Sequence, residues 1–168
     1  MASFHEMDWK ELSFNPFTKI SKQWMLVTAG SEEKSNTMTA SWGGLGVLWG
    51  APAATIYLRP QRYTKEFVDR EEYFTLCFFG EEYRKALSLC GSKSGREVDK
   101  VKECGFTVQA AECGAPYFDQ AELVLVCRKR FVQPMDPANI PQDVKEKWYP
   151  QQDYHTMYIG QIVEALVR

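Results

Sequence analysis

The run "NTMTASWGGLGVLWG", Asn36 to Gly50, decides the fold, because its composition suits neither a helix nor an ordinary core segment. It combines small hydroxyl side chains with two Trp and four Gly, and it carries no charge. The uncharged stretch extends from Lys34 to Arg59, which is long enough to raise the question of a membrane span. Its glycines and Pro52 argue against a helix, so we predict two strands joined by a glycine-rich turn.

The segments on either side of this run continue the strand pattern. "WMLVTA", Trp24 to Ala29, is predicted to be a strand, and "GSEEKS", Gly30 to Ser35, is its polar turn. The opening run is therefore expected to form the return strand of a hairpin. "ATIYLR", Ala54 to Arg59, places different kinds of side chain on alternate faces, which is typical of a third strand.

Short helices and further strands follow. Asn15 is expected to cap a helical turn that begins at Pro16, and Thr64 is expected to cap a second helix that ends before Tyr73. The strand Tyr73–Phe79 is apolar or aromatic on both faces, which indicates burial on both sides, in a barrel or at a subunit interface. Two more helices are predicted. One covers 81–91 and is stopped by Gly91, and the other covers 94–105 and is opened by a capping box of Ser94 and Glu97. Three more strands are predicted at Phe106–Ala110, Ala121–Val132 and His155–Val167.

The segment Gln133 to Tyr154 is rich in Pro, Gln and Asp, and it separates the last two predicted strands. We predict a surface excursion here, with a helical turn around Asp143 to Trp148. The whole pattern of many short strands with brief helices indicates a closed or nearly closed antiparallel barrel.

Bulk composition narrows the class of protein. The 168 residues suit one domain, 1–168, and the net charge of −2 gives no basic excess for binding a nucleic acid. Five cysteines without a C-x-x-C pair and only two histidines argue against a metal centre. The acidic N-terminus does not look like a signal peptide, so we expect reduced thiols and a cytoplasmic location, with no membrane association.

Several nucleotide and hydrolase motifs fail on spacing. "GGLGVLWG" has Trp49 where the third glycine of a dinucleotide fingerprint belongs, and no helix pattern follows. "GSKSG", Gly91 to Gly95, is not a P-loop, although a helix opened by Ser94 could bind a phosphate. An ordinary helix cap with a solvated Lys93 explains the same residues. No G-x-S-x-G elbow is present, and neither histidine has a local partner motif.

The hairpin and the basic segment after it contain the residue types that a phosphorylated flat cofactor needs. Hydroxyls and backbone N–H groups can border a ring, an aromatic residue can form its wall, and basic residues can bind the phosphate. A surface hairpin followed by a solvated charge run is an equally good reading of the residues alone. The candidates are Thr39, Ser41, Trp42, Arg59, Arg62 and Thr64.

Five motifs in order resemble one known family. They are "NTMTASWG", "LRPQRYT", "EYFTLCFF", "LCGSKSGREVDK" and "DYHTMYIGQIVE", and together they extend over nearly the whole chain from about Trp24 to Glu164. The chain resembles the flavin reductase-like, FMN-binding split-barrel family, especially its flavoredoxin-like branch. The resemblance implies a mainly β fold, a split β-barrel of Greek-key antiparallel type with a few short helices. It also implies FMN as the cofactor and a homodimer with flavin near the subunit interface, which would suit the burial of Tyr73–Phe79 and of Trp148 with Tyr149.

The resemblance also assigns residues to the site. Ser41 and His155 are the candidates for a catalytic role, since His155 matches a histidine near the flavin or nicotinamide. Whether Lys93 or Lys100 reaches the phosphate is left open. The strand bordering the isoalloxazine and ribityl chain would be Met38, Thr39, Ala40, Ser41 and Trp42, the phosphate segment Arg59, Arg62, Tyr63 and Thr64, and the S-G-R-x-x-D-K pattern near the cofactor Ser94, Arg96, Asp99 and Lys100.

The activity implied is that of a flavoprotein oxidoreductase, which passes hydride or electrons from NADH or NADPH through FMN to an acceptor. A non-catalytic FMN electron-transfer carrier, a flavoredoxin fed by a redox partner protein, is the main alternative. An empty barrel used for binding or assembly is a second alternative, and a pyridoxamine-phosphate oxidase-like activity a third. The excursion Gln133 to Tyr154 precedes His155, so it could cover the flavin, exclude a nicotinamide and favour the carrier.

Overall fold

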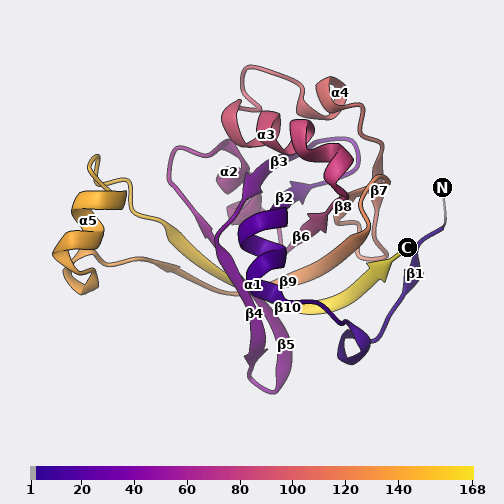
Figure 1. The fold of residues 1–168 in the computed structure, drawn as a ribbon, viewed down its shortest axis with the longest axis horizontal. Helices are drawn as coiled ribbons and strands as arrows, with labels where there is room; N and C mark the ends of the chain where they lie inside the picture. The colour runs from indigo at the N-terminus through magenta and orange to yellow at the C-terminus, as the bar shows by residue number, and fades with distance from the viewer. Residues whose placement is uncertain (1–2) are drawn as a thin grey trace.

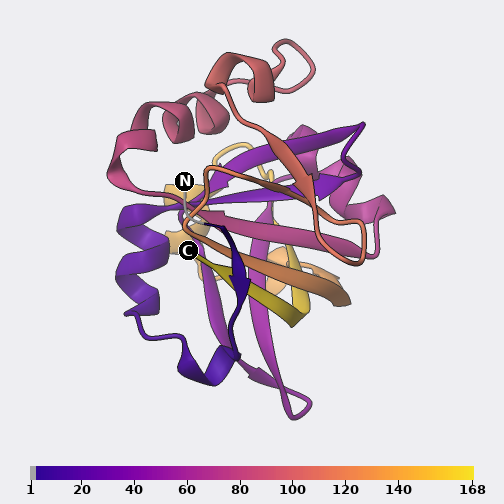
Figure 2. The same cartoon turned by 90° about the vertical axis from the view of Figure 1, so that its right-hand side faces the viewer.

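A computed structural model describes residues 3–168, and it is built around one antiparallel sheet (Figure 1). The strand order is β3-β2-β6-β9-β10-β5-β4, and β1 pairs with the end of β10. Figure 2 shows β1 beside the C-terminal end of β10, where His5 lies opposite Val167. The strands are β1 (His5–Glu6), β2 (Met25–Gly30), β3 (Ser35–Ala40), β4 (Gly43–Leu48), β5 (Ala51–Leu58), β6 (Tyr73–Phe78), β9 (Leu123–Pro134) and β10 (Thr156–Val167), with β7 (Val108–Ala110) and β8 (Pro116–Phe118) forming a separate pair.

The two edge strands of the sheet, β3 and β4, are consecutive in the chain. Only Ser41 and Trp42 lie between them, and no pairing between β3 and β4 occurs within residues 3–168. A sheet that curls on itself but leaves its first and last strands unpaired is a split barrel. The predicted fold class, a mainly β antiparallel split barrel with a few short helices, is confirmed, and Ser41 and Trp42 lie where the barrel opens.

The hairpin β2–β3 is confirmed, with Met25 opposite Ala40 and Gly30 opposite Ser35. The prediction that a glycine-rich turn follows it is wrong. Residues 43–48 form the strand β4, which pairs with β5 along its whole length, so the uncharged run contains three strands. The turn lies at Trp49 and Gly50, which have φ values of 51° and 73°. Hydrogen bonds to β5 therefore outweigh the poor strand propensity of glycine here.

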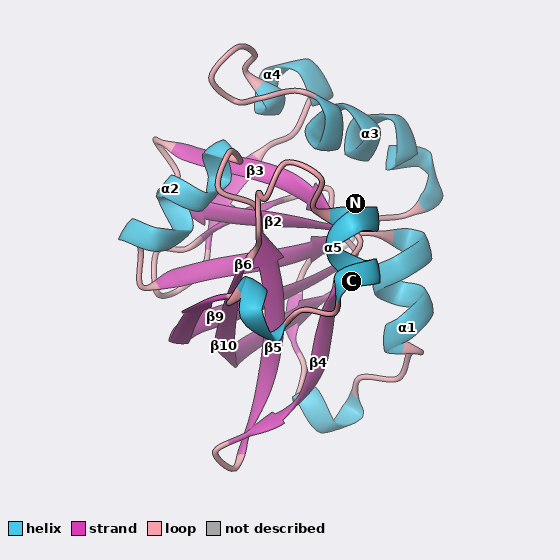
Figure 3. Cartoon of the chain, turned by 90° about the vertical axis from the view of Figure 1, so that its left-hand side faces the viewer, coloured by secondary structure: helices cyan, strands magenta, loops and turns pink. Residues whose placement is uncertain are grey.

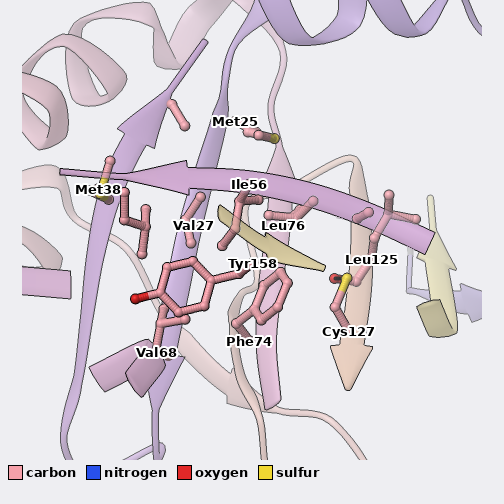
Figure 4. Close-up of a cluster of buried hydrophobic side chains, with 14 of the residues drawn as sticks. Met25, Val27, Met38, Ile56, Val68, Phe74, Leu76, Leu125, Cys127 and Tyr158 are labelled. Carbon is pink, nitrogen blue, oxygen red and sulfur yellow. Dashed lines mark hydrogen bonds between the residues drawn. The ribbon is translucent and has the colours of Figure 1, made fainter. Parts of the chain in front are cut away.

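The core has two parts, one on each face of β6. Figure 4 shows the cluster inside the barrel, where the rings of Phe74 and Tyr158 lie next to each other. A second cluster on the outside contains Phe79, Phe106 and Phe118, whose rings stack under the helices. The double-sided burial predicted for Tyr73–Phe79 is confirmed, and it arises within this chain, since alternate residues enter the two clusters.

Residues 3–168 contain five α-helices. Asn15 caps the first, as predicted, through bonds from the backbone N–H groups of Phe17 and Thr18. The excursion forms a helix at Gln142–Trp148, as predicted, and this helix projects away from the sheet (Figure 1). The helices are α1 (Pro16–Thr18), α2 (Tyr63–Arg70), α3 (Arg84–Ser92), α4 (Lys100–Cys104) and α5 (Gln142–Trp148). Figure 3 shows that α3 and α4 lie together over the β3 and β2 side of the sheet.

Three predicted helix ends are wrong. Thr64 lies inside α2 and accepts a hydrogen bond of 2.7 Å from the Asn36 side chain, so its hydroxyl ties α2 to β3. Gly91 does not stop α3, which continues to Ser92. A side chain at Gly91 would press against Thr39 of β3, so the glycine permits close packing here.

The prediction that Ser94 and Glu97 form a capping box at the start of a helix is also wrong. The helix α4 begins only after Asp99, whose carboxylate accepts from the backbone N–H of Lys102 at 3.1 Å. Ser94 instead starts an isolated turn, since its carbonyl accepts from the N–H groups of Glu97 and Val98. A helix N-terminus at Ser94 is therefore not available for binding an anion.

Within residues 3–168 the longest apolar helical stretch is too short to cross a membrane.

Candidate functional site

The split of the barrel contains two adjoining pockets. They share the side chains of Ser41, Trp42, Tyr57 and His155, so they form one continuous hollow. The smaller pocket has a volume of about 240 Å³ and the larger pocket about 550 Å³. Both lie where β3 ends and β4 begins, beside the start of β10.

The smaller pocket brings together eight of the residues predicted for the site. Tyr57 and Trp148 also line it, although neither was assigned to the cofactor. Tyr57 of β5 lies two residues before Arg59, which directly follows the strand, so strand alternation places both side chains on one side and was the available signal. The eight predicted residues are Met38, Thr39, Ala40, Ser41, Trp42, Arg59, Arg62 and His155.

Arg62 is the most distinctive group of this pocket. Its Nη1 donates to the carbonyl of Gly91 at 2.9 Å, but its buried Nη2 has no hydrogen-bond partner among residues 3–168. Burial lowers the pKa of this guanidinium, although arginine stays charged at neutral pH. A buried cation with an unused donor is costly by itself, so it favours an anionic ligand.

A third pocket of about 190 Å³ adjoins the smaller one, because Arg62 lines both. The predicted phosphate-binding residues are thus divided between two pockets. Lys93 is exposed at the rim, and Ser94 is half-buried beside it. The predicted residues in the third pocket are Arg62, Tyr63, Thr64, Lys93, Ser94 and Lys100.

Lys100 is buried, and its hydrogen bonds are made inside the protein. Its Nζ donates to the carbonyl of Thr37 at 2.7 Å and to that of Cys90 at 2.9 Å. Burial lowers the pKa of this amine to about 8. Lys100 therefore joins α4 to β3 and α3, and it supports the end of α3 that holds Arg62.

Arg59 also binds protein groups. Its Nη1 lies 2.8 Å from an oxygen of Asp153, and its Nη2 donates to the Trp148 carbonyl at 3.0 Å. The same carboxylate accepts from Gln61 at 2.8 Å, and the guanidinium lies 5.0 Å from the Tyr149 ring. In this structure Arg59 thus fastens the excursion to the barrel.

His155 lies among aromatic rings at the centre of the hollow. Its ring is 5.3 Å from Trp42 and 6.4 Å from Tyr57, and the Tyr149 hydroxyl is 2.7 Å from its Nδ1. Burial, and then the nearby Arg59, lower the pKa of His155 to about 4. The imidazole is therefore neutral at pH 7 and does not act there as a ready-charged acid.

The larger pocket extends from the shared residues toward α1. It is lined by Phe17, Ile20 and Ser21 at one side, and by Gly44 and Leu45 of β4 at another. No Lys, Arg, Asp or Glu side chain belongs to this lining. Sequence reasoning missed this pocket, because α1 and β4 are distant in the chain and no local motif links them.

Arg96 and Asp99, the other members of the S-G-R-x-x-D-K pattern, have structural contacts. Arg96 pairs with Glu66 and lies 4.5 Å from the Tyr63 ring, while Asp99 caps α4. Within residues 3–168 no group of three or more His, Cys, Asp or Glu is placed to hold a metal ion. The hollow combines hydroxyls, aromatic rings and one incompletely bonded cation.

Comparison with known proteins places this geometry in a family. The family described as "Flavin reductase like domain" matches residues 17–168. The chain therefore belongs to the flavin reductase-like family, as the sequence motifs predicted. No curated protein sequence matches it.

Solved structures with the same fold are distant in sequence. A flavoredoxin from Methanosarcina acetivorans is 22% identical with a TM-score of 0.70, over 87% of this chain and 68% of that one. An FMN-binding domain of a flavin reductases-like enzyme from Shewanella baltica is 18% identical with a TM-score of 0.70, over 98% and 77%. An FMN-binding protein from Thermus thermophilus is 20% identical with a TM-score of 0.69, over 86% and 71%. At these identities the likeness shows the fold alone.

Proposed function

We propose that this chain is an FMN-binding flavoprotein, a flavin reductase-like oxidoreductase that passes hydride or electrons from NADH or NADPH to an acceptor. The observation that carries the proposal is the half-buried Arg62, whose buried Nη2 is unused, in a pocket of hydroxyls and aromatic rings where the other cation, Arg59, is already paired with Asp153. A ribityl phosphate would satisfy this guanidinium, and a neutral ring suits the pocket. Membership of the family and the FMN-binding proteins among its structural neighbours support the same cofactor.

The residues present fit the cofactor with distinct tasks. FMN supplies the capacity to accept and donate hydride or single electrons. Arg62 would bind its phosphate, with Lys93 and Ser94 at the rim of the third pocket. The Thr39 hydroxyl already donates to the Leu87 carbonyl, whereas the Ser41 hydroxyl has no partner among residues 3–168. Ser41 is therefore the better candidate for a hydrogen bond to the flavin ring.

The structure gives a specific reason to keep the carrier as a second candidate. Trp148 packs edge-on against Trp42 at 5.0 Å, and Tyr149 bonds to His155, so the excursion covers part of the hollow. Arg59 and Asp153 hold it there. A covered site favours delivery of electrons by a redox partner protein over entry of a nicotinamide.

One experiment separates the two candidates. The purified protein is mixed with FMN, its visible spectrum is recorded, and NADH or NADPH is added without air. Bleaching of the flavin bands supports the reductase and identifies the donor. Bleaching by dithionite alone supports the carrier. Absence of bound flavin contradicts both candidates and leaves a barrel used for binding or assembly.

We also propose a homodimer in the cytoplasm. Phe17, Val47 and Trp49 are 82%, 68% and 68% exposed, and burial of such residues against a second copy would stabilise a dimer. The strand Tyr73–Phe79 lends no support, because its burial is explained within one chain. A sedimentation run that finds a monomer with bound FMN would contradict the dimer.

A further inference from the structure

The larger pocket has no charged group with which to pair a charged ligand. Its lining carries no Lys, Arg, Asp or Glu, and the imidazole of His155 is neutral at pH 7 because burial and Arg59 lower its pKa to about 4. Arg59 itself is paired with Asp153. Moving an unpaired charge from water into such a place is costly, so an uncharged ligand is favoured.

The walls of this pocket are mostly apolar and aromatic. The rings of Trp42, Tyr57 and Tyr149 line it, with Phe17 of α1 at its other side. Aromatic walls bind flat molecules well, because stacked and edge-on ring contacts add to the burial of apolar area. At about 550 Å³ the pocket has room for a small ring compound.

The polar groups of the pocket present hydrogen-bond donors. The Tyr149 hydroxyl lies 2.7 Å from Nδ1 of His155, and the His155 backbone also bonds to it. Burial raises the pKa of Tyr149, so the phenol keeps its proton, and we assign this proton as the one donated to Nδ1. The imidazole proton then lies on Nε2, which has no protein partner within the described residues.

The side chain that carries this N–H borders both pockets. His155 lines both of them, and so does Ser41, whose hydroxyl is also without a partner among residues 3–168. A ligand in the larger pocket would thus meet donors at the border of the smaller pocket, which is the one proposed for the cofactor. A ligand oxygen that accepts a hydrogen bond would satisfy them.

We propose that the larger pocket binds a small, uncharged, planar molecule with a hydrogen-bond-accepting oxygen, such as a ketone, quinone or nitro compound, as the electron acceptor. This proposal rests on the proposed function for its redox role, but the binding itself depends only on the pocket. Tyr149 is a positioning residue in this arrangement, because its bond to Nδ1 leaves Nε2 of His155 as the donor for the ligand.

Three matched probes test the charge and the oxygen separately. They are 4-methylacetophenone, 4-acetylbenzoate, which replaces the methyl group by a carboxylate, and 4-ethyltoluene, which lacks the oxygen. Binding is measured by ligand-observed NMR titration on the protein with and without FMN. We expect the ketone to bind at least about tenfold more tightly than the carboxylate. The hydrocarbon should bind about threefold to tenfold more weakly than the ketone, as for one lost hydrogen bond.

Variants of β4 and of Tyr149 locate the binding. A side chain at Gly44 enters open space in the lining, so Gly44→Leu should fill the pocket and abolish ketone binding. Gly46→Leu is the matched control, because this glycine also has open space but lies outside both pockets. Tyr149→Phe should weaken binding of the ketone about threefold and leave binding of the hydrocarbon unchanged.

Each contrary result overturns the proposal in a recognisable way. Equal binding of ketone and carboxylate, or retained ketone binding in Gly44→Leu, shows that the pocket does not select this class. Loss of FMN from Gly44→Leu but not from Gly46→Leu shows that the flavin itself fills the larger pocket, and the proposed function then stands without this acceptor site. Ketone binding by a protein that never retains FMN contradicts the proposed function and the acceptor's redox role, while the pocket's selectivity remains.

Discussion

At the scale of single residues, we propose that Arg62 and Ser41 have different tasks in the cofactor site. Arg62 has a buried unused donor, whereas Ser41 offers a hydroxyl where the barrel opens. A phosphate contact is alike in both redox states of a flavin, so it sets affinity, whereas a contact to the ring changes with its charge. We expect Arg62→Ala to weaken FMN binding about tenfold or more, as for a lost charged hydrogen bond. Ser41→Ala should shift the reduction potential or rate and retain FMN.

Fluorescence titration with FMN and a potentiometric titration of the bound flavin measure the two effects. Arg128→Ala is the control, because this half-exposed arginine pairs with Glu72 away from the hollow. The division of labour is wrong if Ser41→Ala and Arg62→Ala lose FMN equally.

At the scale of elements, an ion pair and hydrogen bonds near Asp153 hold the excursion around α5 against the barrel. The Asp153 carboxylate bonds to Arg59 and Gln61, and Arg59 also bonds to the Trp148 carbonyl. The partly buried ion pair contributes roughly 1 kcal/mol. We expect Asp153→Ala to raise the rate of tryptic cleavage at Lys145 and Lys147 of α5 about fivefold, because the opened excursion becomes more populated.

Asp143→Ala is the matched control, since Asp143 belongs to the same excursion but makes no ion pair among the described residues. Unchanged cleavage in Asp153→Ala would show that other contacts hold the excursion. If the excursion also restricts entry of a nicotinamide, the same variant should be bleached faster by NADH or NADPH than the parent protein.

At the scale of the whole molecule, the buried His155 couples stability to pH. Its pKa is about 4 in the folded protein and 6.5 when unperturbed, so the unfolded chain binds more protons between these values. The free energy of unfolding should therefore fall as the pH is lowered from 6.5 to 4, and this contribution should level off below pH 4. Urea unfolding at several pH values measures it.

His155→Asn is the comparison that isolates this contribution, because the carboxylates that also lose stabilising contacts in acid remain in both proteins. The parent protein should lose more stability than the variant between pH 6.5 and 4. Parallel curves for the two proteins would mean that His155 is not held neutral.

Local patterns were enough to predict most of the fold. Trp24–Ala29 and its return strand were recognisable from a strand, a polar turn and a second strand, all neighbours in the chain. Asn15 before Pro16 predicted a cap for the same reason, since a cap involves residues two or three positions apart. The error at Thr64 occurs where a distant partner decides, since its hydroxyl accepts from Asn36, 28 residues earlier in the chain. The errors at β4 and Ser94 are local, because glycines hid a strand that pairs with the adjacent β5, and because Asp99 rather than Ser94 caps α4.

The residues of the smaller pocket could be predicted by family resemblance, because they lie in short consecutive motifs. Which of these residues are already paired within the protein could not be predicted in this way. Arg59 and Arg62 look alike in "LRPQR", yet one is paired with Asp153, 94 residues further along the chain, and the other has an unused donor. Whether a charged side chain is free depends on what the folded chain brings to it, and no local pattern contains that information.

The sequence by itself determined the class of fold, the family and the strand on which the proposed cofactor would lie, because periodicity, turn residues and consecutive motifs are local properties. Only the tertiary structure decided where the barrel opens, which basic groups are already paired, and that α1 and β4 enclose a second, uncharged pocket. The physical reason is that pockets and ion pairs form between segments far apart in the chain, and their energies depend on burial and distance, which exist only after folding.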